Sequence, residues 1–404
     1  MTRQEAVHER PVWHGARMTH VLDGGALYAT YDRFPAPKGA STHIARFAGA
    51  LLGAADHGLL HCLAGDSLPP YQQEGTITIR RTAATEVHPL GRAERFGAEV
   101  ADSVARERWT TTQGREPWSV MALLAEDRTW PVVYEVNGLP SIEWAETYPQ
   151  APRADLRAID GLERWCLDRV DAVVTPSAVT AQALTDRGVT SDRIAVIPNG
   201  ADIPDPALPR PPDAPSGPYL VYAGGLQPWQ GVDVAVRALS RIRDLDMPLV
   251  IVTGARPRQL RPLLQLAWRL DVGDLVHVRN AQDAAGTSAW LVHASVSLAP
   301  LRDTPRNTVQ GCCPLKVVES LAAGTPVIGS DLEVIRTEVP DGIHGLLVRP
   351  DRPRDLARAI RVALDAPEAL ARWGAAGRAH IASNRTWSAA EQALLDVHVR
   401  LITT

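Results

Sequence analysis

The stretch Cys312-Cys-Pro-Leu-Lys-Val-Val-Glu-Ser-Leu-Ala-Ala-Gly-Thr-Pro-Val-Ile328 predicts the start of a helix that carries a lysine and a glutamate. Pro314 suits the first helical turn, because the N–H that a proline lacks would have no partner there. The free N–H groups near Leu315 and Lys316 then face an incoming anion, with the positive end of the helix dipole behind them. Glu319 lies one turn further along on the same face. The stretch therefore predicts an anion-binding site at a helix amino terminus.

Lysine is rare in this chain. Of 42 lysines and arginines, only Lys38 and Lys316 are lysines. A compact ammonium on a flexible stem binds a phosphate as a point charge, whereas a guanidinium needs room for its planar fork. Surface lysines and arginines interchange freely, so chance is the alternative for each lysine. The motifs around them favour phosphate sites.

Composition predicts a globular, cytoplasmic protein of two domains. The 404 residues exceed one ordinary core, and the net charge of -4 offers no broad surface for a nucleic-acid polymer. Residues 1–16 are polar and read as a loose leader, and no apolar run is long enough for a membrane span. The cysteines lack metal-ligand or secreted-scaffold spacing, so we expect reduced thiols. They are Cys62, Cys166, Cys312 and Cys313.

Short apolar runs alternate with helical patterns, which predicts an α/β chain of parallel sheets covered by helices. A Pro-rich segment at 204–218 reads as a linker between a domain over 1–203 and another over 219–385. Residues 386–404 predict a last helix that returns to the first domain, opened by a capping box of Ser388 and Glu391. We expect strands at Met18–Leu22, Val132–Val136, Ala172–Thr175, Ile194–Ile197, Tyr219–Ala223, Leu249–Thr253, Leu275–Val278, Val296–Ala299 and Pro326–Gly329.

Two motifs close the first half. Asp171-Ala-Val-Val-Thr-Pro-Ser177 reads as a strand and a serine turn, and Arg193-Ile-Ala-Val-Ile-Pro-Asn-Gly-Ala-Asp202 follows a helix closed by Gly188. Pro-Asn-Gly alone is merely a turn, so the order and spacing carry the information. In this order the motifs resemble the GT-B-fold retaining glycosyltransferases of family four (glycosyltransferase group 1), whose first domain closes with "ipNGvD".

The second half extends the resemblance. Tyr219–Leu226 is a strand running into a glycine turn, and Gly231 opens the next helix, which brings backbone N–H groups against phosphate. Residues 312–328 resemble the family's "pfGlvllEamAcGtPVI", and Asp341–Val348 resembles "dGvnGllv". The motifs cover most of residues 170 to 400. The resemblance implies two Rossmann-like doubly wound parallel-sheet domains that face each other across a cleft.

The resemblance also implies a donor site for a nucleoside-diphosphate sugar, with UDP or GDP as the nucleotide. Glu319 matches the glutamate that binds ribose hydroxyls, although an ordinary solvated helix residue is the alternative. Lys316, Glu319, Arg306 and His43 are the candidates for catalysis. The expected donor-binding residues are Gly224, Gly225, Leu226, Gln230, Arg302, Gly311, Pro314, Leu315, Lys316 and Glu319.

Three positions depart from the family pattern. Gly225 and Gln230 stand where the family has an arginine and a lysine that hold the diphosphate. Gly311 stands where a glutamate faces the donor sugar, so the sugar cannot be inferred. The cations expected to compensate are Arg302, Arg306, Lys316 and Lys38.

In the first domain, Pro35–His43 occupies the place of the family's glycine loop, between the first strand and a helix over Ile44–Leu52. Lys38, Gly39 and Ala40 could then approach the diphosphate or the acceptor, and a helix-capping turn is the alternative.

Arg115, Glu135 and Asn137 lie at predicted strand ends and are candidate contacts for the acceptor or sugar, or structural turn residues. The nearest candidate base is His43. Retaining enzymes of this fold are thought to let the departing phosphate take the acceptor proton, so positioning and charge stabilisation carry the catalysis. Asp244-Leu-Asp246 falls in a predicted helix-to-strand turn, and we expect no metal.

The leading hypothesis is a metal-independent retaining transferase that glycosylates a small polar acceptor, for example in antibiotic or low-molecular-weight thiol metabolism. The alternatives are a sugar-nucleotide-binding protein without turnover and a lipid or polysaccharide glycosyltransferase. The lipid alternative requires a basic amphipathic helix, whereas Arg92–Arg108 mixes both charge signs. A dinucleotide-dependent dehydrogenase is remote, because no G-x-G-x-x-G follows a strand.

Overall fold

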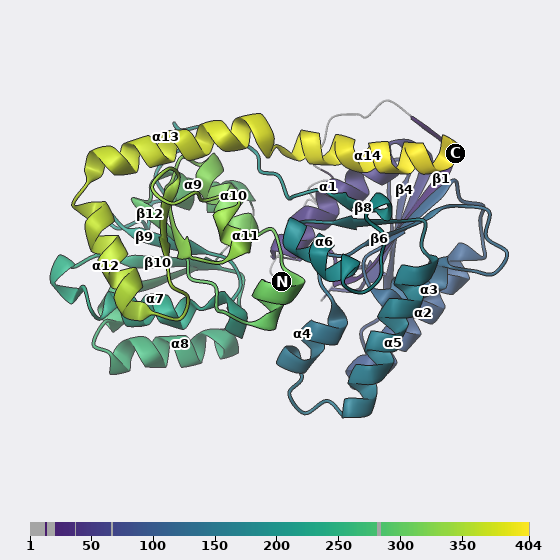
Figure 1. Ribbon diagram of the computed structural model, residues 1–404, viewed down its shortest axis with the longest axis horizontal. Coiled ribbons are helices and arrows are strands. Elements are labelled where there is room, and N and C mark those ends of the chain that lie inside the picture. Colours follow the sequence, from purple (N-terminus) through teal and green to yellow (C-terminus); the bar gives the residue numbers. More distant parts are fainter. Residues whose placement is uncertain (1–12, 14–20, 37, 66–67, 281–283, 404) are drawn as a thin grey trace, which may run out of the picture.

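The structure is a computed structural model that describes residues 13, 21–36, 38–65, 68–280 and 284–403. Two parallel-sheet domains lie side by side (Figure 1), as the sequence predicted. The first sheet has the order β3-β4-β2-β1-β5-β6-β7-β8, and all its pairs are parallel except β3 with β4. Its strands are β1 (Leu22–Arg33), β2 (Ala55–Leu63), β3 (Tyr71–Glu74), β4 (Ile77–Thr82), β5 (Thr111–Gly114), β6 (Val132–Glu135), β7 (Ala172–Thr175) and β8 (Ile194–Val196).

The first sheet is covered on both faces. Alternate residues of β1 enter different cores: Ala26 and Tyr28 pack with α1 and α14, whereas Leu27 and Ala29 pack with α2, α3 and α5. This double burial explains why β1 is apolar at successive positions. The helices that follow these strands are α1 (Gly39–Gly53), α2 (Pro89–Val104), α3 (Pro117–Leu123), α4 (Pro140–Thr147), α5 (Arg153–Arg169) and α6 (Ala178–Thr185).

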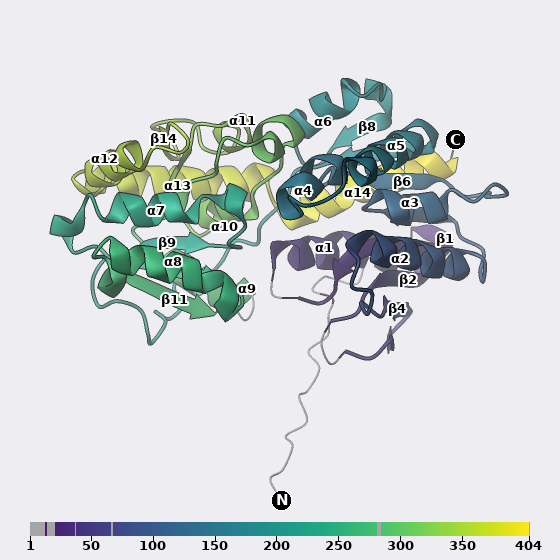
Figure 2. The same cartoon turned by 90° about the horizontal axis from the view of Figure 1, so that it is seen from below.

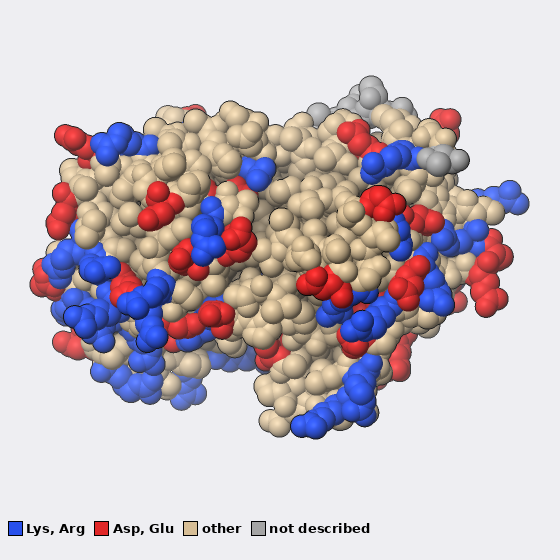
Figure 3. All heavy atoms as spheres, in the orientation of Figure 1, with Lys and Arg blue, Asp and Glu red and all other residues tan. Residues whose placement is uncertain are grey.

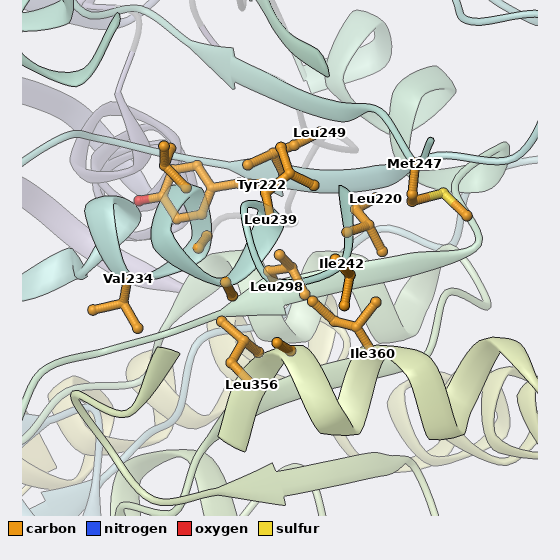
Figure 4. Close-up of a cluster of buried hydrophobic side chains, with 14 of the residues drawn as sticks. Leu220, Tyr222, Val234, Leu239, Ile242, Met247, Leu249, Leu298, Leu356 and Ile360 are labelled. Carbon is orange, nitrogen blue, oxygen red and sulfur yellow. The ribbon is translucent and has the colours of Figure 1, made fainter. Parts of the chain in front are cut away.

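The second sheet is parallel throughout, in the order β11-β10-β9-β12-β13-β14. Figure 4 shows one of its cores, in which Leu220 and Leu249 of the sheet meet Leu356 and Ile360 of α12. Its strands are β9 (Leu220–Ala223), β10 (Leu249–Thr253), β11 (Val276–Asn280), β12 (Val296–Ala299), β13 (Val327–Ser330) and β14 (Gly345–Val348). Its helices are α7 (Val232–Leu239), α8 (Pro257–Arg269), α9 (Ala284–Val292), α10 (Leu315–Ala322), α11 (Glu333–Arg336), α12 (Pro353–Leu364) and α13 (Pro367–Asn384), with short helical turns η2 (Pro228–Gln230), η3 (Arg243–Leu245), η4 (Gly273–Leu275) and η5 (Arg306–Gln310). The turn η1 (Ser191–Arg193) precedes β8 in the first domain.

The last helix, α14 (Trp387–Thr403), lies against the first domain, whereas α13 lies on the second (Figure 1). Leu394 and Leu395 are buried in the core that α14 shares with α1. The predicted capping box is wrong: the helix begins one residue before Ser388, and the Thr386 hydroxyl accepts a hydrogen bond from Ala389 N at 3.3 Å. Glu391 lies 3.5 Å from the Arg46 guanidinium instead.

The two chain segments that cross between the domains touch each other. Ala201 N donates to Arg385 O at 2.9 Å, and Ala201 forms a bridge with Thr386. A Cβ on Gly200 would stand 2.3 Å from Trp387 N, so this approach needs a glycine.

In the first domain the strands expected at 132–136, 172–175 and 194–197 match β6, β7 and β8, whereas β2, β3, β4 and β5 were not predicted. The expected strand at Met18–Leu22 falls largely on residues outside the described ranges, and β1 continues to Arg33. The paired glycines Gly24 and Gly25 interrupt its apolar run; a Cβ on Gly25 would meet His57 Nε2 at 2.4 Å. The expected helix over Ile44–Leu52 starts five residues earlier, at Gly39.

We predict that Leu394→Ala lowers the free energy of unfolding of the first domain by about 2–5 kcal/mol, because it leaves a cavity between α14 and α1. Ile402→Ala removes an apolar side chain from the same helix where it is 37% exposed, and should cost under about 1 kcal/mol. Urea denaturation of both variants measures the difference. Equal losses would contradict the packing of α14 described above.

Candidate functional site

Lys316 is buried at the start of α10. Its residue is 8% exposed, its ammonium donates a hydrogen bond to Gln230 Oε1, and it lies 5.4 Å from the centre of the Tyr222 ring. Pro314 is the residue before the helix, not part of its first turn as predicted, because its ψ of 106° is extended. Two predicted donor-site residues, Lys316 and Gln230, are therefore in direct contact.

The glycine turn after β9 makes room for this lysine. Gly224 has φ of +145°, and a Cβ there would stand 3.1 Å from Lys316 Cε. The Tyr222 hydroxyl donates a hydrogen bond to Gly225 O, which holds the turn in place. Gly231, at the start of α7, could not carry a Cβ either, since it would meet Pro300 O at 1.9 Å. The turn, Lys316 and α10 form one compact cluster.

Burial shifts the pKa values of two ionisable side chains of α10 toward 7. Burial lowers the pKa of Lys316 to about 8, with Arg306 acting in the same direction and Cys312 and Glu319 opposing it. Burial also raises the pKa of Glu319 to about 7, against the attraction of Lys316. An anion that enters this cluster would stabilise the charged lysine, because it supplies the missing counter-charge.

Arg306 connects the cluster to the first domain. Its Nε lies 3.2 Å from Glu143 Oε1 of α4, and its guanidinium lies 5.5 Å from the centre of the Trp229 ring. Gln310 donates to the same Glu143 oxygen at 2.7 Å and accepts from Leu139 N at 2.9 Å. Helix α4 thus meets η5 at the junction of the domains (Figures 1 and 2).

Arg302 is placed differently from the other expected cations. Its guanidinium is held by Asp233 at 2.7 Å and by Asp351 at 2.6 Å. Two carboxylates already balance its charge, so the structure does not favour a compensating role for Arg302. Leu226, another expected donor contact, packs against the core of the second domain.

Gly311 has no room for a side chain. Its φ is +79°, and a Cβ there would stand 2.9 Å from Ser177 Oγ and 2.8 Å from Val179 Cβ of the first domain. The glutamate that the family pattern places here would clash in this arrangement of the domains.

A buried carboxylate organises the first domain's side of the site. Glu135 is 1% exposed and accepts hydrogen bonds from Tyr28 Oη at 2.7 Å, His43 Nε2 at 2.8 Å and the Asn137 amide. Arg115 Nε lies 2.8 Å from it. Burial alone would raise the pKa of Glu135, but His43 and Arg115 lower it to about 2. Glu135 and Arg115 are thus buried members of a hydrogen-bond network, which favours the structural alternative over a ligand contact for these two residues.

Asn199 carries this network into the second domain. Its Oδ1 accepts from His43 Nδ1 at 2.7 Å, and its Nδ2 donates to Cys313 O at 2.7 Å, immediately before Pro314. Each ring nitrogen of His43 therefore has a side-chain oxygen within hydrogen-bond distance. Sequence reasoning missed Asn199, because Pro-Asn-Gly reads only as a turn.

The predicted glycine loop, Pro35–His43, is helical from Gly39 onward, where α1 begins. Lys38 pairs with Asp32, whose other oxygen accepts from Arg115 at 2.9 Å. Gly39 and Ala40 are the first two residues of α1, and a Cβ on Gly39 would stand 2.9 Å from Leu315 Cδ1. The amino ends of α1 and α10 therefore abut, and helix rather than loop brings Gly39 to the other domain.

The described residues contain no metal-binding cluster and no membrane-spanning helix. No group of three histidine, cysteine, aspartate or glutamate residues among them is arranged to hold a metal ion, and the Asp244 carboxylate pairs with Arg361 at 2.7 Å. No helix in this part of the chain has the length and apolarity to cross a membrane.

Comparison with known families covers both domains. Residues 217–366 match the family described as glycosyl transferases group 1, and residues 38–200 match the glycosyl transferase 4-like domain. The chain belongs to the group 1 glycosyltransferases. This confirms the resemblance drawn from the sequence motifs.

Relatives of this group 1 glycosyltransferase include two bacterial proteins named D-inositol 3-phosphate glycosyltransferase. The one from Streptomyces griseus is 31% identical over 55% of this chain, and the match spans about half (49%) of that relative's length. The one from Xylanimonas cellulosilytica is 29% identical over 74% of this chain and 72% of its own.

Solved structures confirm the GT-B fold. Sucrose-phosphate synthase from Thermosynechococcus elongatus superposes with a TM-score of 0.78 at 19% identity, covering 94% of this chain and 99% of that one. Anabaena HepE, solved in complex with UDP-glucose, gives a TM-score of 0.71 at 16% identity, covering 93% and 100%.

We predict that Lys316→Met stabilises this glycosyltransferase below pH 8, by up to about 3 kcal/mol, because it removes the cost of burying an ammonium. Between pH 8 and 10.5 the folded lysine is neutral while the unfolded one is still charged, so the wild type gains stability with rising pH and the difference shrinks. Denaturant unfolding of both proteins at pH 7.5 and 9.5 measures it. A difference that does not change with pH would contradict the burial of a charged Lys316.

Proposed function

We propose that this chain is a retaining glycosyltransferase that moves a sugar from UDP or GDP to a small polar acceptor. The observation that carries the proposal is the buried Lys316 ammonium at the amino terminus of α10, for which the Gly224 turn leaves space. A buried cation beside free helix N–H groups suits a phosphate better than any other common ligand.

The chemistry needs little more than charge and position. When the bond between the sugar and the diphosphate breaks, negative charge grows on the leaving oxygen, and Lys316, Arg306 and the α10 amino terminus can neutralise it. The acceptor oxygen forms its bond on the same face of the sugar, and its proton passes to the departing phosphate. No separate base is required. His43 then serves as a positioning residue, since it touches Glu135 and Asn199 and sits deep in the network.

UDP is the first nucleotide to test. We assign the ribose hydroxyls to Glu319, one turn from Lys316, and HepE, which has the same fold, was crystallised with UDP-glucose. The relatives' name suggests a small polyol as acceptor. We propose no metal in the reaction, since Lys316 and Arg306 supply positive charge. We also propose a cytoplasmic location, with which four free, buried cysteines agree.

A sugar-nucleotide-binding protein without turnover is the second candidate. The packing of Gly311 against Ser177 and Val179 favours it, because the position that normally faces the donor sugar carries no side chain. Hydrolysis of the donor separates the two candidates.

We predict that UDP raises the melting temperature of the wild type and that Lys316→Met weakens UDP binding at least about tenfold, because a hydrogen bond to a charged group contributes about 1.5–3 kcal/mol. GDP, ADP and NAD run in parallel identify the base. Arg349→Met, which removes an exposed cation, is the control and should bind UDP as the wild type does. A wild type that responds to none of the nucleotides would refute the donor site.

We further predict slow hydrolysis of a UDP-sugar that initially releases the sugar in the donor's own anomeric configuration and that persists in EDTA. Proton NMR of the anomeric signal measures the configuration of the released sugar and the rate of hydrolysis with and without EDTA. Inverted product, or loss of activity in EDTA restored by a divalent ion, would contradict the retaining, metal-independent reaction. Binding without any hydrolysis would favour the second candidate.

A further inference from the structure

Four aromatic side chains form a continuous row in the first domain, which we call the aromatic row: Tyr31, Trp118, Trp144 and Tyr148. Their ring centres are separated by 5.3 Å from Tyr31 to Trp118, 5.7 Å from Trp118 to Trp144 and 4.9 Å from Trp144 to Tyr148. Tyr31 and Trp144 are partly buried, Trp118 is 4% exposed and Tyr148 is 37% exposed, so the row reaches the surface at its Tyr148 end.

The row lies at the edge of the sheet where ligands bind in doubly wound folds. Tyr31 is near the carboxyl end of β1, Trp118 follows β5, and Trp144 follows β6. Helix α4, which carries Trp144, buries none of its residues. An aromatic side chain left half-buried on such a helix presents apolar surface that the fold itself does not cover.

Trp144, the third member of the row, follows a residue that contacts the second domain. Glu143, the neighbour of Trp144 in α4, is the residue that Arg306 and Gln310 contact from the second domain. A molecule on the row would therefore lie beside the cations that hold the leaving diphosphate.

Charges along this edge are already balanced. Asp32 is shared by Lys38 and Arg115, and Glu135 also pairs with Arg115. Arg92 and Glu116 both act on the Tyr31 hydroxyl. On the face drawn in Figure 3, basic and acidic residues are likewise interspersed rather than segregated around the domain junction. A phosphorylated acceptor would have to displace a carboxylate here, and a neutral one would not.

We infer that the aromatic row is the acceptor subsite, and that it takes a neutral acceptor with a flat apolar ring face beside its reacting hydroxyl or amine, in place of a phosphorylated polyol. This inference rests on the proposed function, because only a transferase has an acceptor. It differs from what the relatives' names suggest, because the first domain here pairs Lys38 and Arg115 internally and offers aromatic rings in edge-to-face and tilted contact instead.

The test uses the full chain with two probes, 4-nitrophenyl β-D-glucopyranoside and myo-inositol 1-phosphate, each with saturating UDP and each followed by saturation-transfer NMR titration. We expect the aryl glucoside to bind, and Trp144→Leu to weaken its binding about five- to tenfold while the UDP-induced melting shift is unchanged. Trp165→Leu is the matched control: Trp165 is 36% exposed on α5 of the same domain, stacks on Arg169, and should have no effect.

A second variant, Tyr148→Ala, guards against misfolding of the first, since Tyr148 ends the row at the surface. Tighter binding of the inositol phosphate than of the aryl glucoside, or aryl-glucoside binding that neither variant weakens, would overturn the inference. If UDP fails to bind the wild type while the aryl glucoside still depends on Trp144, the ring-binding surface stands and the donor proposal alone fails. Asp32→Asn, which removes the ion-pair partner of Lys38 and leaves Arg115 paired with Glu135, should increase binding of the inositol phosphate; no gain would overturn the charge argument.

Discussion

The burial of one ammonium group constrains most of the second domain's ligand-binding edge. Lys316 lies under a glycine turn, beside a tyrosine ring and against an amide oxygen, and none of these partners carries a full negative charge. A buried cation without a counter-ion is costly, and proteins keep such groups where a ligand supplies the missing charge. Gly224 leaves space for this lysine, and Gln230 accepts its hydrogen bond at the start of α10.

The same cluster accounts for the departure from the family pattern at Gln230. The family places a lysine at the position of Gln230, and here that amide oxygen instead accepts the hydrogen bond of Lys316. The positive charge is therefore retained and comes from α10. On the other side of the junction, Glu135, His43 and Asn199 connect the first sheet to the carbonyl before α10, so both domains fix the helix terminus that the diphosphate would meet.

Local patterns predicted much of the fold and part of the site. β10 and β12 match the expected strands Leu249–Thr253 and Val296–Ala299, because uninterrupted apolar runs specify buried parallel strands. Strands β1 to β5 contain glycines or polar residues whose partners are distant in sequence, so local patterns did not reveal them, whereas β6, β7 and β8 were predicted. The same reason hid Asn199, and pairing with Asp233 and Asp351 removed Arg302 from the expected set of cations. Roles that depend on long-range partners were beyond the reach of sequence spacing.

The two lysines make a direct measurement of the central claim straightforward. Protein labelled with 13Cε-lysine gives two side-chain signals, which Lys316→Met assigns, and a pH titration with and without UDP follows each ammonium. The account predicts that the Lys316 signal titrates near pH 8 in the free protein and that UDP moves its pKa upward, since a diphosphate stabilises the charged form. A Lys316 signal that titrates near 10.5 and is unchanged by UDP or GDP would contradict it.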